Sequence, residues 1–332
     1  MVDARARFVA LPKAEIHVHL EGTLEAAEIV ALAAAAGEAL PRAPEDFLRF
    51  KDLADFLTFL DWSCGLVRST EQMTELAYRF SRRMQAAGTR YADVIINPMH
   101  WQAWQRRVPE LIAALDAGFT AAEADGLPPA GLCISLLRSQ TADQALELVE
   151  LLTSLKHPRV VALSIDGNEA AAGRTGPRFA EAFRRAGARG LHRTVHAGES
   201  SGPEGVRDAV ELLGAERIDH GVRAIEEPTL VAQLVERAIP LDICPTSNVS
   251  LGIFPTLAAH PLEALRRAGV RISVNTDDPV LFGVSHADEY ATCAAAFGWT
   301  DDVVRAVART SIEASFANPD LKTRLLADLA AW

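Results

Sequence analysis

Two histidines separated by a single residue stand near the start of the sequence. His17 and His19 alternate with apolar residues over 14–20, which predicts a strand with both imidazoles on one face. A strand of this kind can offer two nitrogen ligands to one divalent metal ion. The alternative is a pair of polar residues on a solvated strand face.

A second polar group follows the short apolar segment 191–195. His196 comes first, and Glu199 follows after an Ala-Gly step. An imidazole binds a metal or moves a proton, and a carboxyl group can do the second. Taken alone, this segment is equally well explained by a histidine that meets solvent where a strand ends.

Two adjacent carboxylates occur late in the chain, in the run NTDDP. Asp277 and Asp278 repel each other when both are buried, unless a cation or a proton lies between them. Pro279 fixes the backbone that follows and disfavours helix at Asp278. The pair is therefore costly unless it has a function.

Three histidines and one aspartate together make a set of donors that suits Zn²⁺ and leaves a position for water. Zinc lowers the pKa of such a water towards about 7. Glu199, His220 and Asp278 then remain to move protons and to bind a substrate. The expected ligands of one zinc ion per chain are His17, His19, His196 and Asp277.

The elements that must bring these residues together are short strands alternating with helices. Eight such strands in one chain favour a (β/α)₈ barrel, a single domain over residues 1–332, rather than a doubly wound sheet. The carboxyl ends of barrel strands meet on one face, where the polar residues would converge. The predicted strands cover 14–19, 91–97, 131–136, 160–165, 191–195, 217–220, 239–243 and 270–275.

Between the first two strands, residues 23–88 have a helical pattern, with Thr23 as a possible N-cap. This segment is too long for an ordinary loop and predicts a helical lid over the site. Leu53, Phe56, Leu57 and Leu60 recur at helical spacing within it. They suit either plain core or a hydrophobic gate above the substrate.

Composition limits the partner to a small molecule. The formal net charge of −11 argues against nucleic acid and anionic membranes, which both require clustered Lys and Arg. Four cysteines far apart in the sequence suggest neither a disulfide framework nor a thiolate zinc site, which fits a cytoplasmic protein. No apolar stretch predicts a signal peptide or a membrane span. The oligomeric state stays open.

Six motifs in order along nearly the whole chain carry a resemblance. The sequence resembles the adenosine deaminase family of the amidohydrolase superfamily, whose members remove ammonia from C6 of a 6-aminopurine. The motifs are LPKAEIHVHLEGTL (11–24), GNE (167–169), GLHRTVHAGE (190–199), IDHG (218–221), CPTSN (244–248) and NTDDP (275–279).

The resemblance implies a role for each matching residue. Glu199 would protonate ring nitrogen N1, His220 would position and deprotonate the attacking water, and Asp278 would hydrogen bond N7. Gly167 would offer its N–H to N3, and Glu21 would lie near the sugar. The zinc ligand His19 and the lid residues Phe56 and Leu57 would also border the substrate.

The expected reaction converts adenosine or deoxyadenosine to inosine or its deoxy form plus ammonia. The alternatives are adenine deaminase and aminodeoxyfutalosine deaminase. Departures from the family pattern lie near the ring or sugar pocket: Ser164 and Asp166 precede Gly167, Glu21 replaces an Asp common in animal members, and 97–101 does not match the usual run.

Two rival functions are also considered. A binuclear amidohydrolase needs a carboxylated lysine at the end of the fourth strand, but Lys156 precedes that strand. A barrel that binds nucleosides without catalysis need not keep Glu199 and His220. Five further histidines are expected to be structural or exposed: His100, His157, His192, His260 and His286.

Overall fold

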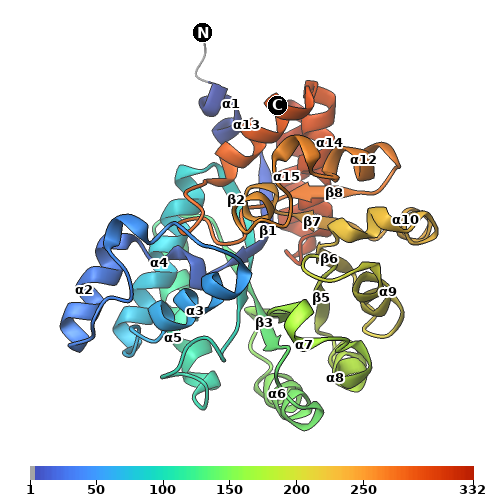
Figure 1. Ribbon diagram of the computed structural model, residues 1–332. Helices are drawn as coiled ribbons and strands as arrows, with labels where there is room; N and C mark the ends of the chain where they lie inside the picture. Colours follow the sequence, from blue (N-terminus) through green and yellow to red (C-terminus); the bar gives the residue numbers. More distant parts are fainter. Residues whose placement is uncertain (1–3) are drawn as a thin grey trace.

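The computed structural model describes residues 4–332, so the first three residues of the expected domain lie outside the described part. Eight parallel strands lie side by side in chain order (Figure 1). They confirm the predicted (β/α)₈ barrel. The strands are β1 Lys13–His19, β2 Thr89–Ile96, β3 Ala130–Leu137, β4 Val160–Asp166, β5 His192–Ala197, β6 Arg217–His220, β7 Leu241–Ile243 and β8 Ile272–Val274.

Helices surround this sheet and connect its strands (Figure 1). Amphipathic helices cover apolar strands on the outside, as the alternating sequence pattern requires. The α-helices are α1 Ala4–Ala10, α2 Ala26–Ala36, α3 Leu53–Cys64, α4 Thr70–Ala86, α5 Val108–Ala124, α6 Ala142–Leu155, α7 Glu169–Ala172, α8 Gly176–Ala188, α9 Pro203–Glu211, α10 Pro228–Glu236, α11 Pro245–Ser250, α12 Leu262–Arg267, α13 His286–Phe297, α14 Asp301–Ala314 and α15 Pro319–Ala331.

The first strand contains a bulge. The register between β1 and β2 shifts between Glu15 and Val18. At that point the side-chain carbonyl of Asn275 accepts hydrogen bonds from the backbone N–H groups of Ile16 (2.9 Å) and His17 (3.3 Å). A bulge redirects the side chains that follow it. This one contains His17 and lies two residues before His19.

The barrel closes between its last and first strands through a narrow seam. An isolated bridge joins Val18 to Asp277 just beyond β8. The N–H of His19 donates to the carbonyl of Asp277 (2.7 Å), and the N–H of Asp277 donates to the carbonyl of His17 (3.2 Å). Predicted metal ligands therefore form the seam itself.

The insertion between β1 and β2 is helical but divided. It contains the 3₁₀ turns Glu21–Thr23 and Pro44–Asp46 and the helices α2, α3 and α4. Thr23 does not cap a helix, because its hydroxyl donates to the carbonyl of Leu20. Helix α2 begins later, and the carboxylate of Glu28 accepts from the N–H of Glu25 there.

A charged cluster lies inside the barrel. Arg217 is buried and contacts Asp93 (2.6 Å) and Asp242 (2.9 Å).

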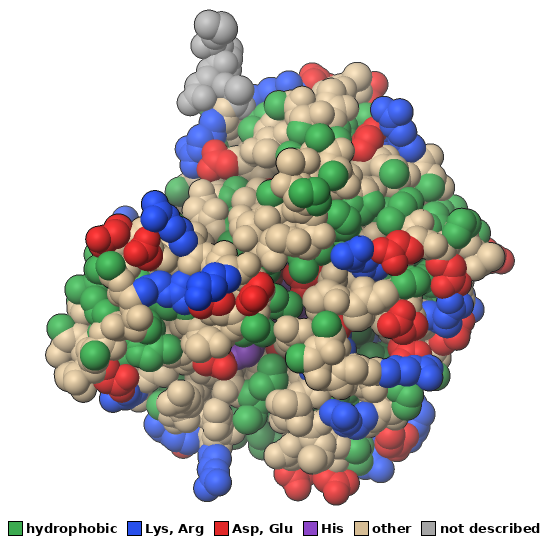
Figure 2. All heavy atoms as spheres, in the orientation of Figure 1, with side chains coloured by type: hydrophobic (Ala, Val, Ile, Leu, Met, Phe, Trp, Pro, Cys, Tyr) green, Lys and Arg blue, Asp and Glu red, His purple; other side chains and the backbone are tan. Residues whose placement is uncertain are grey.

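Charges of both signs are scattered over the face shown in Figure 2, and histidine is visible in a hollow near its centre. Within residues 4–332, none of the helices has the length and hydropathy needed to cross a membrane.

Candidate active site

The four predicted metal ligands meet at the mouth of the barrel. The Nε2 atom of His196 lies 3.1 Å from Nε2 of His17 and 3.0 Å from Nε2 of His19. Oδ1 of Asp277 lies 3.4 Å from the Nε2 atoms of both His17 and His19. All four side chains are buried, and their donor atoms lie within 4.8 Å of one another.

These distances fit one tetrahedral cation. Ligand atoms at zinc distances lie roughly 3.3–3.6 Å from one another, close to the observed separations. Burial lowers the pKa of His19 to about 3, which keeps this imidazole in its neutral, ligating form. Burial also opposes protonation of His17, yet the facing Asp277 outweighs it and raises the pKa to about 9. The negative charge of Asp277 therefore favours a cation beside His17.

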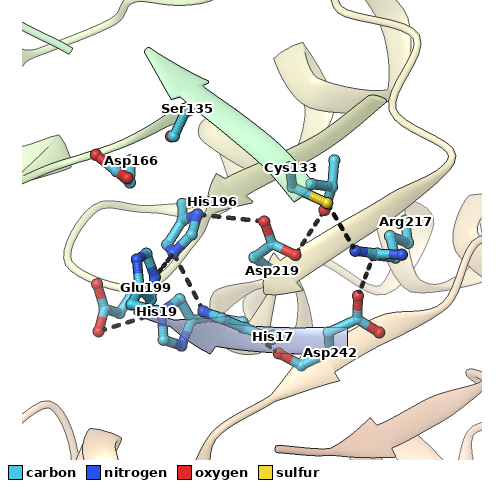
Figure 3. A network of polar contacts seen from close by, with 12 residues as sticks. His17, His19, Cys133, Ser135, Asp166, His196, Glu199, Arg217, Asp219 and Asp242 are labelled. Atoms are coloured by element: carbon cyan, nitrogen blue, oxygen red, sulfur yellow. Dashed lines mark hydrogen bonds and ion pairs between the residues drawn. The ribbon is translucent and has the colours of Figure 1, made fainter. Parts of the chain in front are cut away.

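Polar groups behind the histidines fix the orientation of two rings (Figure 3). Nδ1 of His17 lies 2.9 Å from the carbonyl oxygen of Asp242, and Nδ1 of His196 lies 3.2 Å from Oδ2 of Asp219. Asp219 is itself held by the hydroxyl of Thr194 (2.6 Å). In both rings Nε2 is thus directed at the metal position, an arrangement common around protein metal sites.

Glu199 lies beside this cluster with its carboxyl group buried. Its Oε1 is 3.5 Å from Nε2 of His220 and 3.5 Å from the amide nitrogen of Asn248. Burial, reinforced by the charges of Asp277 and Glu169, raises its pKa to about 8. Glu169 also accepts from the backbone N–H of Glu199 (2.9 Å), which anchors the segment. With this pKa, the carboxyl group of Glu199 holds a proton at neutral pH.

His220 ends β6 in an unusual backbone conformation. Its φ of 66° lies in the left-handed region, which costs energy for a residue with a side chain. Burial holds its pKa well below the usual range, so the ring is neutral. The amide of Asn248 lies 3.3 Å from Nδ1, and His260 contacts the other end of that amide at 3.1 Å.

Asp278 lies against the backbone of Gly22. A Cβ at Gly22 would come within 2.2 Å of the Asp278 side chain, so only glycine fits there. Burial, together with the charges of Asp277 and Glu21, raises the pKa of Asp278 well above its usual value. Its Oδ1 has no hydrogen-bond partner among the described residues. This oxygen is available for a ligand.

A narrow cavity lies above these groups. Helix α3 closes one side of it with apolar side chains, and Phe56 stacks on Phe282 from the segment after β8 at 5.1 Å between ring centres. Gly167, predicted to bind the substrate, lines the wall with φ 96°. The apolar lid residues in the lining are Leu53, Phe56, Leu57 and Leu60.

Glu21 lies beside the cavity but is fully buried. Its Oε1 accepts from the indole N–H of Trp101 (2.7 Å) and from the backbone N–H of Asn97 (2.8 Å). Burial raises its pKa to about 7. The segment 97–101, which departs from the family pattern, therefore covers the carboxylate that the resemblance assigned to the sugar.

His100, expected to be structural or exposed, is buried and lines the cavity. Its ring lies between Asp61 of α3 (2.5 Å) and Asp166 at the end of β4 (3.7 Å). Its only signal in the sequence was the departure from the family pattern at 97–101. Sequence reasoning also gave no role to Asn248, although the quoted CPTSN motif contains it.

Comparison with known proteins agrees with this geometry. The model of the adenosine deaminase family matches residues 12–332. The chain belongs to the adenosine deaminase family. Membership in the adenosine deaminase family makes it a hydrolytic deaminase that acts on a C–N bond. Its relatives within the family indicate that the reaction is purine deamination.

Individual relatives match over almost the whole chain. Adenine deaminase of Streptomyces coelicolor is 37% identical and covers 97% of this chain and 96% of its own. Aminodeoxyfutalosine deaminase of the same organism is 35% identical, with coverages of 99% and 87%. A zinc-bound amidohydrolase structure from Burkholderia ambifaria has 29% identity and a TM-score of 0.91, covering 100% of this chain and 93% of its own.

Proposed function

We propose that this protein is a zinc-dependent adenine deaminase, which converts adenine and water to hypoxanthine and ammonia. The sequence placed adenosine first and adenine among the alternatives. The relatives favour those alternatives, because adenine deaminases and aminodeoxyfutalosine deaminases match the chain at 34–37% identity.

The observation that carries the choice of the free base is the covered state of Glu21. Trp101 and Asn97 occupy one of its oxygens and bury the whole side chain. The other oxygen, Oε2, has no hydrogen-bond partner among the described residues, but Glu21 does not line the cavity, so its carboxylate offers little to a ribose hydroxyl there. The wall that would face a sugar is therefore closed by the protein's own residues.

The chain's own residues divide the chemistry among themselves. Glu199 donates a proton to N1 of the purine, which makes C6 electrophilic, and neutral His220 removes a proton from the attacking water. Asp278 and the backbone of Gly167 orient the ring. The proton taken up by His220 passes to the exocyclic nitrogen and the C6–N bond breaks, so that ammonia leaves. N1 keeps the proton from Glu199, and the proton of the C6 hydroxyl returns to Glu199 as the carbonyl forms. Zinc, when bound, supplies the Lewis acidity that makes water nucleophilic near neutral pH.

We assign the metal as zinc, one ion per chain, held by His17, His19, His196 and Asp277. A second possible group of ligands, which includes His220 and Cys244, shares His17 and Asp277 with the first. Two separate ions cannot both use these two side chains fully. Elemental analysis of the purified protein should give about one zinc per chain, and two tightly held ions would contradict the assignment.

Ammonia release from a panel of purines tests the substrate. Adenine should have the highest kcat/KM, ahead of adenosine, deoxyadenosine and aminodeoxyfutalosine. If a tailed nucleoside is fastest, the adenine assignment fails while the deaminase remains. Turnover of adenosine above that of adenine would restore the expectation drawn from the sequence.

A further inference from the structure

Two carboxyl groups that line the cavity each have a buried oxygen without a hydrogen-bond partner among the described residues. These oxygens are Oδ2 of Asp166 and Oδ1 of Asp278. An unsatisfied buried acceptor is costly, and the cost disappears when a ligand donates to it. The roles above use Asp278 but leave Asp166 unassigned, although Asp166 lines the cavity directly.

The protein holds Asp166 in place and favours its charge. The side-chain amide of Asn97 donates to Oδ1, and the ring of His100 lies 3.7 Å from the same oxygen. Burial opposes ionisation of Asp166, but the contact with His100 outweighs it and holds the pKa below its usual range. Both neighbours belong to the segment after β2, and both act on Oδ1. Oδ2 is left to the cavity.

The position of Asp166 in the chain suggests what it binds. It directly precedes Gly167, so a side-chain acceptor stands next to a backbone N–H donor at the end of β4. Free adenine carries the complementary pair on one edge, with N3 as acceptor beside N9–H as donor. Any substituent on N9 removes that donor, and a nucleoside therefore lacks it.

We propose that Asp166 is a specificity-determining residue whose Oδ2 accepts the N9–H of the free purine base. This inference rests on the proposed adenine deaminase function. A ligand without the N9–H leaves a buried carboxylate unpaired, and sites built around a hydrogen bond reject such ligands strongly. Selectivity for the base then has an electrostatic origin in addition to the closed wall at Glu21.

The test uses adenine and its isostere in which a ring oxygen replaces N9–H. The two molecules have nearly the same shape, so steric exclusion does not separate them. The kcat/KM of each is measured with the wild-type zinc enzyme and with D166N and D166S. Comparing the adenine-to-isostere ratio between enzymes cancels the intrinsic reactivity of the two rings.

The wild-type ratio should exceed the ratio of either Asp166 variant by about 10- to 100-fold, with the loss falling on adenine. D61N is the matched control, because it removes a charge from the other side of His100 without changing the cavity wall. Its ratio should stay within about twofold of wild type. Zinc content and thermal melting check that each variant is folded and loaded.

The outcomes separate the two hypotheses. If the wild-type enzyme does not deaminate adenine, the proposed function fails. If it does, but the ratio is the same in D166N and D166S as in wild type, the role of Asp166 is overturned. Should both variants fail to fold, the inhibition constant of the isostere on the wild-type enzyme decides: a value equal to the KM of adenine contradicts the inference.

Discussion

Glu199 is held in place by contacts to its backbone and by contacts to its carboxyl group. Its backbone N–H is fixed by Glu169, and its carboxyl group lies between His220 and Asn248. His260 fixes the amide of Asn248 in turn. The carboxyl group that we propose as the proton donor is therefore positioned, directly or through Asn248, by residues from four separate segments of the chain.

Replacing Glu199 with Gln should keep the fold and the zinc and remove the chemical step. Glutamine has nearly the same shape but no transferable proton, and general acid–base groups contribute roughly 10²- to 10⁴-fold to rate. Single-turnover rates and metal content measure the two effects. Near-normal turnover of E199Q would place the acid elsewhere.

Some site residues could be predicted from sequence and others could not, for a geometric reason. His17, His196 and Asp277 stand at the ends of apolar strands, which a periodic pattern reveals. Asp219 directly precedes His220, and strand alternation predicts that the two face opposite ways. The left-handed φ of His220 breaks this alternation, so that both residues serve the same site.

Among the elements, β1 shows what a hydrophobic pattern omits. The alternation predicts the strand and its boundaries to within one residue of Lys13–His19. It does not predict the bulge, because the bulge depends on Asn275, which is some 260 residues away and accepts from two backbone N–H groups. Nothing local in the sequence of β1 specifies this partner.

Changing Asn275 to Ala should destabilise the protein by about 2–4 kcal/mol, because two buried N–H groups lose their acceptor. Zinc affinity should also fall, since the bulge sets the direction of His17. Denaturant unfolding of the metal-free protein and chelator competition measure these effects separately. A variant with lower stability and unchanged zinc affinity would show that the bulge does not orient the ligands.

Glu289 of α13, which accepts hydrogen bonds from Thr246 of α11, should make the stability of the protein depend on pH. Glu289 is fully buried and accepts from the N–H (2.7 Å) and the hydroxyl of Thr246. Burial raises its pKa to about 7, although the bonds from Thr246 oppose the rise. Between about pH 4.5 and 7 the folded protein keeps a proton that the unfolded chain has lost, so this group's contribution to stability falls as pH rises.

Replacing Glu289 with Gln removes this titration. The free energy of unfolding of E289Q should therefore fall less steeply than that of wild type as pH increases from 4.5 to 7. Chemical denaturation at several pH values measures both slopes. Parallel curves would show that Glu289 does not titrate in this range.

The predicted lid 23–88 is the element whose sequence pattern was least informative. The sequence has the same helical pattern throughout this segment, yet its helices lie in different places. Helix α4 packs against β2 and α5 as an outer helix of the barrel, whereas α3 borders the cavity. Apolar spacing alone cannot distinguish these two environments. We propose that α3 and the segment around it act as the lid.

For the molecule as a whole, the alternation of strands and helices was sufficient to predict the barrel. Each predicted strand overlaps one observed strand, and the order in the sheet follows the chain. What the pattern could not show is how the sheet closes, because closure depends on a few bonds between the two ends of the chain. Those bonds involve His17, His19 and Asp277.

Removing the metal should therefore loosen the seam of the barrel. Without a cation, the ligands that flank the bridge from Val18 to Asp277 lose their shared partner. Amide hydrogen exchange should accelerate in β1 and after β8 in the metal-free protein, while β3 and β4 keep their protection. Uniform exchange along the chain would mean that the seam is not coupled to the metal.

The zinc site that we propose would also tie the lifetime of the protein to metal supply, because its ligands form the seam. Free zinc at about 1,000 times its dissociation constant stabilises a folded chain by roughly 4 kcal/mol. In a cell short of zinc, chains that have not acquired the ion would open at the strand pair that the ion normally secures, and proteases degrade opened chains first. Inactive enzyme would then be cleared rather than stored, and its abundance would follow the availability of zinc.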